Sequence, residues 1–202
     1  KLIEEFMLLA NRSVATHIYR LKKGGEKNTF VYRTHDFPNP EKVADFAKFA
    51  TQFGHKVNVE ERSVSRSLNR LMDEIEGKPE QNVLQSLAVR TMAKAKYTTE
   101  AKGHFGLAFE HYTHFTSPIR RYPDLLVHRG IKAVLEKKQY QPGDWVEIGG
   151  HCSANERRAD EASRDVENWL KCFYMQDRVG ETFTGSISSV VPFGIFVALD
   201  DV

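Results

Sequence analysis

The stretch from His114 to Arg129, HFTSPIRRYPDLLVHR, concentrates side chains suited to phosphate chemistry. It contains hydroxyls, two adjacent arginines, a tyrosine, a carboxylate and a second His-Arg pair. Arginine is permanently charged and presents a planar fork of donors that matches phosphate oxygens. Arg120 and Arg121 are therefore candidate phosphate ligands. The alternative is a solvated basic turn in which an arginine pairs with Asp124.

Two prolines constrain the backbone on either side of these arginines. Pro118 pushes Ser117 out of the helical region, and Pro123 fixes φ at a value that suits the first turn of a helix. The sequence therefore predicts a turn followed by a helix. The expected buried stripe of that helix is Val127, Ile131, Val134 and Leu135.

Asp124 lies about one helical turn before His128 and Arg129, so the three side chains can share one surface. We expect this carboxylate to orient an arginine or a histidine rather than to bind a metal ion.

The same stretch resembles the signature of the RNB catalytic domain, which occurs in ribonuclease II and ribonuclease R. The resemblance covers most of the chain in four blocks: residues 2–15, 103–129, 151–172 and 179–201. The block HCSANERRADEA, with its WLKC ending, is more similar to ribonuclease R. Ser163 stands where ribonuclease II has a functionally important glutamate, so that role is not carried over.

The resemblance implies a fragment of a hydrolytic, processive 3′-to-5′ exoribonuclease. Such an enzyme degrades single-stranded RNA to nucleoside monophosphates with magnesium. Arg120 matches the family's catalytic arginine, which neutralises charge that develops on the scissile phosphate. The other positions that match residues lining the RNA site are Glu5, with Glu4 as the alternative, Thr116, Ser117, Arg121, Tyr122 and Arg129.

Magnesium ligands are not expected within this chain. The resemblance places them in an aspartate cluster near the start of the RNB domain, upstream of these residues. Asp200 and Asp201 lie in a different module. His104, His111 and His114 lack a cysteine or carboxylate at zinc-ligand spacing, so hydrogen bonding or stacking is expected of them. We therefore expect the chain to be inactive alone.

The expected fold class is α+β, in two parts. Residues 1–176 resemble the helix-rich, C-terminal part of an RNB domain. Residues 177–202 resemble the opening hairpin of an OB-fold RNA-binding module of the ribosomal S-one type, because apolar residues alternate on both sides of Pro192. In that module the aromatics matching Phe193 and Phe196 stack on bases. Core packing is the alternative for both.

Periodicity predicts the remaining elements. The first helix has a stripe of Leu2, Phe6, Leu9, Ala10, Val14 and Ile18, with Asn11 and Arg12 on its polar face, and is followed by a turn at Gly24-Gly25. Residues 29–33 should form a strand that runs into Arg33, His35 and Asp36. Three helices follow: one from Asn39-Pro40 to Gly54, one over 64–75 closed by Gly77, and one opened by Pro79 with Val83, Leu84, Leu87, Ala88 and Met92 facing the core.

Two further elements rest on local pattern alone. Phe105, Leu107 and Phe109 alternate with small residues, which predicts a strand over 103–115. Residues 139–150 contain Pro-Gly and Gly-Gly and predict a loop. The sequence Ser153-x-x-Glu156 then forms a capping box that should begin a long helix.

Composition restricts the class of protein. The chain has 202 residues, 41% hydrophobic, and a formal charge of +2. That charge does not mark a nucleic-acid binder, but Lys and Arg exceed acids between Ser117 and Lys138. The two cysteines suggest no disulfide framework, and no apolar run suggests a membrane span. We expect a monomeric cytoplasmic protein that binds single-stranded RNA and can take part in an RNA-decay assembly.

The ends of the chain and two competing interpretations of its function remain to be considered. The chain begins without methionine inside a helical pattern and ends after a strand-like run, so we expect a piece of a longer protein. A competing interpretation is a non-catalytic RNA-binding protein that reuses the RNB fold. A magnesium phosphohydrolase acting on small nucleotides ranks last, because it would not explain an appended single-strand-binding module.

Overall fold

The computed structural model describes residues 1–23 and 29–200, without the side chains of residues 22, 23 and 62. The chain divides into two compact units, residues 1–154 and 155–202. The predicted Gly24-Gly25 turn lies outside the described residues. The expected boundary after residue 176 concerns similarity to known modules and stays a prediction.

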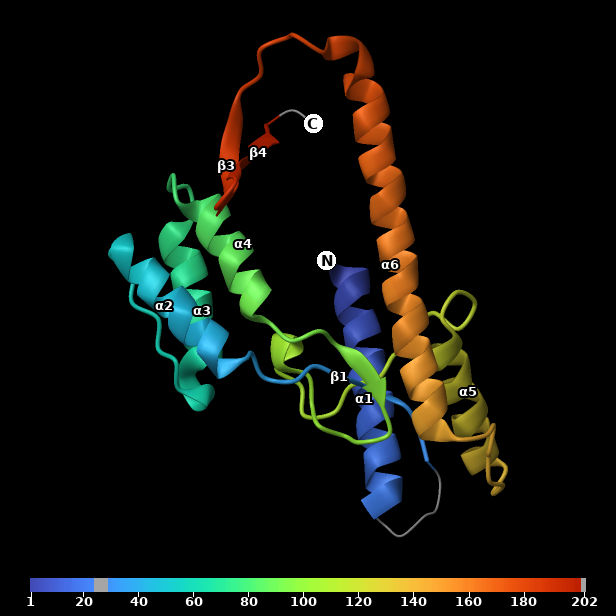
Figure 1. Cartoon of the computed structure of the whole chain (residues 1–202). Helices are drawn as coiled ribbons and strands as arrows, with labels where there is room; N and C mark the ends of the chain where they lie inside the picture. The colour runs from blue at the N-terminus through green and yellow to red at the C-terminus, as the bar shows by residue number, and fades with distance from the viewer. Residues whose placement is uncertain (24–28, 201–202) are drawn as a thin grey trace. The chain divides into compact units, whose positions relative to one another are not determined.

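Most of the chain is helical, in agreement with the predicted helix-rich α+β fold (Figure 1). They are α1 (Leu2–Lys23), α2 (Pro40–Gln52), α3 (Glu61–Ile75), α4 (Gln81–Thr91), α5 (Tyr122–Leu135) and α6 (Trp145–Met175). Two single-turn helices are η1 (Phe105–Leu107) and η2 (Gln176–Arg178). No helix among the described residues is long and apolar enough to cross a membrane.

The strands form two small antiparallel sheets. β1 (Tyr32–Thr34) pairs with β2 (Lys96–Thr98), with Tyr32 opposite Thr98. β3 (Gly185–Val191) and β4 (Gly194–Leu199) form a hairpin in the second unit, and Pro192 lies in its turn as predicted. Assignment of this hairpin to an OB-fold remains a prediction.

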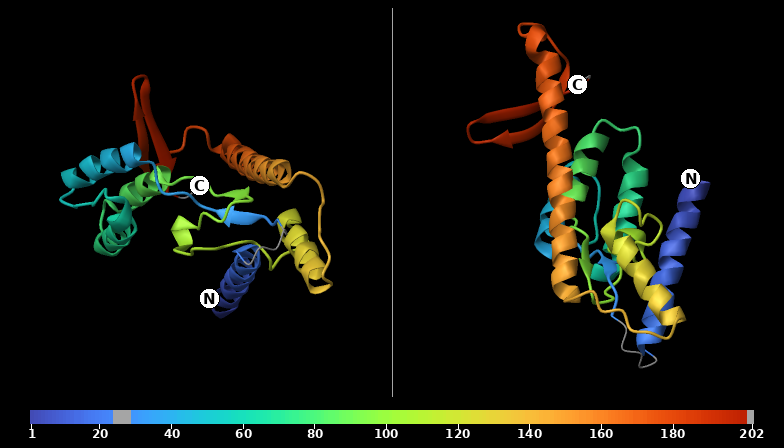
Figure 2. Two further views of the ribbon diagram at one scale, coloured as in Figure 1. Left: turned by 90° about the horizontal axis from the view of Figure 1, so that it is seen from below. Right: turned by 90° about the vertical axis from the view of Figure 1, so that its right-hand side faces the viewer.

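Helices α2, α3 and α4 share one hydrophobic core, and Figure 2 shows them from two further directions. The predicted start of α2 is confirmed. The side-chain oxygen of Asn39 accepts the backbone N–H groups of Glu41 and Lys42 at 2.9 and 3.2 Å. Pro40 occupies the first helical position, where its missing N–H has no intrahelical partner to lose.

A second core joins α1 to β1 and α5. Its buried residues are Ala15, Ile18, Phe30, Tyr32 and Val127. Val31, between two members of this core, instead packs with Tyr97, Leu126, Trp145 and Cys152. Successive side chains of an extended segment point to opposite faces. The segment leading into β1 therefore connects α1 on one side with the start of α6 on the other.

The predicted capping box at Ser153 is wrong, because α6 already begins at Trp145. Asp144 caps it by accepting the N–H groups of Val146 and Glu147 at 2.8 and 3.3 Å. Ser153 is buried, and its hydroxyl accepts the N–H of Tyr97 at 2.9 Å. Gly149 and Gly150, which were expected in a loop, lie inside α6.

The predicted strand over 103–115 is also wrong. Its aromatic alternation belongs to η1 and to Ala108, whose φ of 54° reverses the chain. The segment is held to the β1 region by three backbone bonds: from His35 N–H to the Gly103 carbonyl, from Phe105 N–H to the His35 carbonyl, and from Arg33 N–H to the Tyr112 carbonyl. Pairing with β1 at its two ends replaces a continuous strand.

Some helix faces also differ from expectation. Leu2, Phe6 and Leu9 of α1, Val83 of α4 and Leu135 of α5 are exposed. Helix α4 begins at Gln81 rather than beside Pro79.

Asn11, expected on the polar face of α1, is only 4% exposed. The buried stripe of this helix therefore includes Asn11, Ala15 and Ile18, at a spacing of one and two turns.

Gly130 of α5 provides a test of the second core. A Cβ at this position would lie 2.5 Å from Cε1 of Phe30. We predict that Gly130→Ala lowers the free energy of unfolding by about 1–3 kcal/mol through overpacking, although alanine has the better helix propensity. Gly150→Ala in α6 is the control, because nothing lies within 4 Å of that Cβ. Denaturant unfolding that shows equal effects of the two variants would contradict this packing.

Candidate functional site

The turn that contains the two arginines is anchored from α1 by Asn11. The Asn11 amide donates to the Tyr112 hydroxyl at 3.0 Å. Its oxygen accepts the N–H groups of Phe115 and Thr116 at 2.9 and 3.2 Å. Three bonds from one buried side chain therefore fix the backbone where the turn begins.

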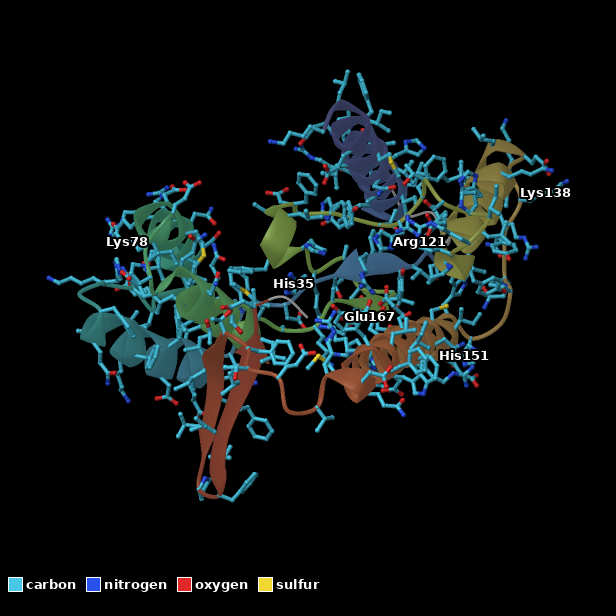
Figure 3. The ribbon with its side chains drawn as sticks, turned by 90° about the horizontal axis from the view of Figure 1, so that it is seen from above. His35, Lys78, Arg121, Lys138, His151 and Glu167 are labelled. Atoms are coloured by element: carbon cyan, nitrogen blue, oxygen red, sulfur yellow. The ribbon has the colours of Figure 1, made fainter. Side chains whose placement is uncertain are left out.

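Asp124 anchors the other end of the turn. This residue is fully buried. Its Oδ1 accepts the N–H of Ser117 at 2.8 Å and a guanidinium N–H of Arg121 at 2.9 Å. The carboxylate also lies in the first turn of α5, where the helix dipole favours a negative charge. Asp124 therefore orients an arginine, and that arginine is Arg121. Arg121 is labelled among the side chains in Figure 3.

The neighbouring Arg120 has a different environment. Its side chain is exposed, and among the described residues it makes no ion pair. Only its backbone is fixed, through an N–H bond to the Ser117 carbonyl at 3.3 Å. The two adjacent guanidiniums are thus unequal: Arg121 is 23% exposed and held by a carboxylate, whereas Arg120 is available to an external anion.

His128 supports the turn rather than pairing with Asp124. Its Nε2 donates to the Phe115 carbonyl at 2.8 Å. The two rings stack with centroids 4.0 Å apart and an interplanar angle of 6°.

A second group of side chains brings Arg33 to the site. The Tyr97 hydroxyl bonds to Nδ1 of His114 at 2.8 Å, and the two rings pack edge to face. The guanidinium of Arg33 lies over the Tyr97 ring, 4.6 Å from its centroid. A cation at this distance interacts favourably with the ring face. β1, β2 and the turn thus meet at one place.

Burial and nearby positive charges lower the pKa values of His114 and His104. Burial, followed by the positive charges of Arg121, Arg33 and Arg120, lowers the pKa of His114 to about 3. Burial, together with His35 and Arg33, lowers the pKa of His104 to about 4. Guanidiniums remain charged at all relevant pH values. The site is therefore cationic at neutral pH and suited to an anion such as a phosphate.

The structure places the predicted site residues in four locations: the turn, α5, α1 and the β3–β4 hairpin. Thr116, Ser117, Arg120 and Arg121 share the turn, and the half-exposed Tyr122 begins α5. The exposed Arg129 follows on α5, and the exposed Glu5 lies near the start of α1.

The two aromatics of the hairpin belong to the second unit. Phe193 and Phe196 are 85% and 53% exposed, and their centroids are 6.3 Å apart. The predicted base-stacking role of these two rings stays a prediction.

Three supporting residues were missed from the sequence: Asn11, Tyr97 and the guanidinium of Arg33. A signal existed for Asn11, because it lies one and two turns before the buried Ala15 and Ile18. No local pattern marks Tyr97, which reaches His114 from a different element.

The described residues do not offer a metal site. Within residues 1–23 and 29–200, no three His, Cys, Asp or Glu side chains lie together so as to hold a metal ion. Asp36, a candidate by residue type, instead pairs with Lys96 at 2.7 Å. The hydrogen bond from Lys96 holds the pKa of this carboxyl below its usual range.

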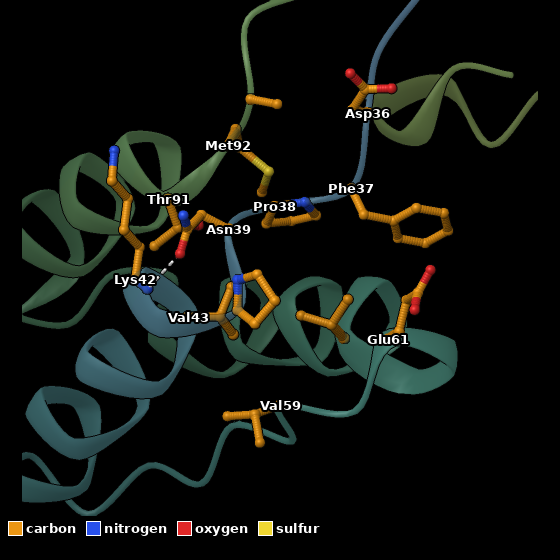
Figure 4. Close-up of a pocket in the computed structure, with 13 residues that line it drawn as sticks. Asp36, Phe37, Pro38, Asn39, Lys42, Val43, Val59, Glu61, Thr91 and Met92 are labelled. Atoms are coloured by element: carbon orange, nitrogen blue, oxygen red, sulfur yellow. Dashed lines mark hydrogen bonds between the residues drawn. The ribbon is translucent and has the colours of Figure 1, made fainter. Parts of the chain in front are cut away.

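A pocket of about 550 Å³ lies among α2, the start of α3 and the end of α4 (Figure 4). Two of its polar side chains are already occupied, because Asn39 caps α2 and Asp36 pairs with Lys96. Val43 and Val64 in its wall belong to the helical core. We regard this pocket as part of the scaffold.

Comparison with known proteins identifies this arrangement. The model of the RNB domain matches residues 1–137. Ribonuclease R of Escherichia coli (strain K12) is 44% identical over 214 aligned residues, which cover 100% of this chain. The chain spans only 26% of that relative. The resemblance inferred from the sequence is confirmed.

Solved structures agree. Mycoplasma genitalium RNase R in complex with ribose methylated single-stranded RNA matches with a TM-score of 0.85 and 27% identity, over 98% of this chain and 32% of that one. Yeast Ssd1, described as a pseudonuclease, matches with a TM-score of 0.62 and 28% identity, over 74% of this chain and 19% of that one.

The depressed pKa of His114 predicts a pH-dependent stability. Its value is about 3 in the folded chain and about 6.5 in the unfolded chain. Between these values the unfolded state binds more protons, so stability falls as the pH decreases through that window. In the wild type, the free energy of unfolding should therefore fall between about pH 7 and pH 5, with about 2 kcal/mol of that fall due to His114. We expect His114→Gln, which retains an acceptor for the Tyr97 hydroxyl, to lose this contribution.

His17→Gln on the exposed face of α1 is the control and should retain the wild-type pH dependence. Denaturant unfolding at the two pH values measures the effect. An unchanged slope in His114→Gln would refute the assignment.

Proposed function

Since the chain belongs to the RNB-domain family, we propose that it is part of a hydrolytic, processive 3′-to-5′ exoribonuclease. The proposed reaction releases nucleoside monophosphates from single-stranded RNA. The observation that carries the proposal is the placement of the guanidiniums. Arg120 and Arg121 lie on one anchored turn. Arg33 lies over the ring of Tyr97, whose hydroxyl bonds to His114 just before that turn. A cluster of guanidiniums stabilises charge that develops on a phosphoryl group.

Arg120 is the proposed catalytic residue. Its guanidinium is exposed and makes no ion pair among the described residues, so it can approach the scissile phosphate. Arg121 contributes a fixed positive charge, because Asp124 holds it in place. Ser117 provides a hydroxyl in the same anchored turn, and Tyr122 presents a half-exposed ring. The Thr116 hydroxyl is buried and has no hydrogen-bond partner among the described residues.

Magnesium is part of the proposal, and its ligands are assigned to an aspartate cluster of the RNB domain outside this chain. The metal would activate water for hydrolysis. The role derived for this chain's residues is narrower: they bind the phosphate, hold its orientation and offset its charge.

The hairpin β3–β4 is proposed to be the start of an OB-fold RNA-binding module. Exposed aromatic rings such as Phe193 and Phe196 offer surfaces on which bases stack. The RNA complex of Mycoplasma genitalium RNase R supports single-stranded RNA as the ligand. We further propose that the protein acts as a monomer in the cytoplasm.

A non-catalytic RNA-binding protein is the second candidate. The similarity to the pseudonuclease Ssd1 favours it, although that match has a lower TM-score than the RNase R match. The aspartate cluster in the full-length sequence discriminates the two: intact aspartates favour the enzyme, and substituted aspartates favour binding alone.

Arg120→Ala in the full-length protein tests the catalytic assignment. We expect turnover to fall by about 10²–10³-fold, because a donor to the developing charge is lost. RNA affinity should weaken only a few-fold. Lys138→Ala, an exposed charge paired with Glu136, should change neither quantity. Equal losses of binding and turnover in Arg120→Ala would make this residue a simple phosphate contact.

The chain as given provides a separate test. Incubated with magnesium and a 5′-labelled single-stranded RNA, it should bind in a salt-sensitive manner but produce no ladder on a sequencing gel. A descending ladder would show that the metal site has been misplaced. Glu4, Glu5, Asp36 and Asp124 would then be re-examined as ligands.

A further inference from the structure

A second cationic pocket lies outside the turn that contains Arg120. It has a volume of about 560 Å³ and is formed by α1 together with residues 108–111. The residues that line it are Arg12, Thr16, Tyr19, Arg20, Ala108, Phe109, Glu110 and His111. None of these belongs to the site described above, so the pocket requires its own explanation.

The helical side of this pocket repeats cations on one face of α1. Arg12, Thr16 and Arg20 follow each other at intervals of four residues, which places them in a row along the helix. Eight residues correspond to about 12 Å along the axis, so Arg12 and Arg20 are too far apart to share a single phosphate and suit two successive contacts with a polyanion.

Both arginines are available. The Arg12 guanidinium lies over the Phe109 ring, 5.3 Å from its centroid, and is thus positioned by a cation–π contact instead of a carboxylate. In the part of the chain that the structure describes, neither Arg12 nor Arg20 makes an ion pair. Glu110 is the one acidic side chain among the pocket's lining residues.

Two aromatic rings line the same pocket as the arginines. Tyr19 and His111 stack with centroids 3.8 Å apart and an interplanar angle of 25°. Within the described residues, the buried Nδ1 of His111 has no hydrogen-bond partner. A buried polar atom of this kind is unusual in a complete site. The stacked pair offers a flat surface of the kind on which bases stack.

We propose that this pocket binds a segment of single-stranded RNA, with phosphates at Arg12 and Arg20 and a base against the Tyr19–His111 pair. The choice of RNA as the polyanion rests on the proposed function, whereas the site itself rests on the pocket. It adds an RNA contact on α1, the helix whose Asn11 anchors the catalytic turn.

A neighbouring pocket of about 690 Å³ has the opposite charge balance and is therefore less suited to RNA. That pocket contains Asp36, Glu61 and Glu110 against Lys102, in addition to its aromatic residues. Its net negative charge repels phosphates. The Arg12–Arg20 pocket has the opposite balance, two arginines against one glutamate.

The double variant Arg12→Ala/Arg20→Ala in the full-length protein tests the proposal. The probe is a short 5′-labelled oligouridylate, and Kd is measured by fluorescence anisotropy over a range of salt concentrations. Loss of two phosphate contacts should reduce the slope of log K against log salt by about 1.4 and weaken binding by about 10–100-fold at low salt. Tyr19→Leu should weaken binding by about 10-fold with the slope unchanged.

Two controls make the result specific. Lys56→Ala/Lys78→Ala removes the same charge from exposed positions and should leave the slope unchanged. Arg12→Lys/Arg20→Lys retains the charge and should restore most of the slope, which excludes misfolding as the cause. An unchanged slope in Arg12→Ala/Arg20→Ala would overturn the proposal. An equal reduction of the slope in Lys56→Ala/Lys78→Ala would overturn it as well.

The two proposals fail in different ways. If the alanine double variant binds as the wild type does while Arg120→Ala still abolishes turnover, only the Arg12–Arg20 pocket is wrong. If the full-length wild-type protein neither binds nor degrades the oligouridylate, the proposed function is wrong and the pocket's assignment to RNA falls with it.

Discussion

The arrangement of the site depends on one buried carboxylate. Burying a charge is costly unless hydrogen bonds and an opposite charge compensate it. Oδ1 of Asp124 meets this condition with the N–H of Ser117 and the guanidinium of Arg121, at the positive end of α5. Oδ2 is buried and has no hydrogen-bond partner within the described residues. Because Pro118 and Pro123 restrict the backbone of this turn, Ser117 and Arg121 stay close to the carboxylate. The same interaction makes the two adjacent arginines different: it immobilises Arg121 and leaves Arg120 facing solvent.

The remaining anchors turn a short segment into a defined cationic surface. Asn11 holds the backbone at Phe115 and Thr116, and His128 holds the Phe115 carbonyl. The guanidinium of Arg33 is positioned by its cation–π contact with the Tyr97 ring. Guanidiniums this close to His114 disfavour a further positive charge, so the imidazole serves as a neutral partner of the Tyr97 hydroxyl. Positive charge is thus carried by groups that do not titrate near neutral pH, and the surface remains suited to phosphate.

The elements predicted correctly are those specified by neighbouring residues. Asn39-Pro40 begins α2, and Pro192 lies between two strands, because caps and turns depend on a few consecutive residues. Prediction failed where a distant segment overrode the local pattern. Ser153 looked like a cap, yet its hydroxyl serves the backbone of Tyr97, and Gly149 lies inside a helix where a Cβ would come within 2.9 Å of the Tyr97 carbonyl oxygen. The aromatic alternation near Phe105 belonged to a single helical turn.

The sequence alone determined the family, the order of most helices and the turn that presents two arginines. These follow from motif residues and from backbone chemistry that acts over a few positions. Only the tertiary structure decided that Asn11 is buried, that Arg33 joins the site, and that Arg12 lies over Phe109. Each of these depends on contacts between residues far apart in the chain; the Asn11–Tyr112 bond, for example, spans 101 positions. Such contacts form only when several elements bury their apolar faces together, and no local pattern encodes which polar group will lie opposite another.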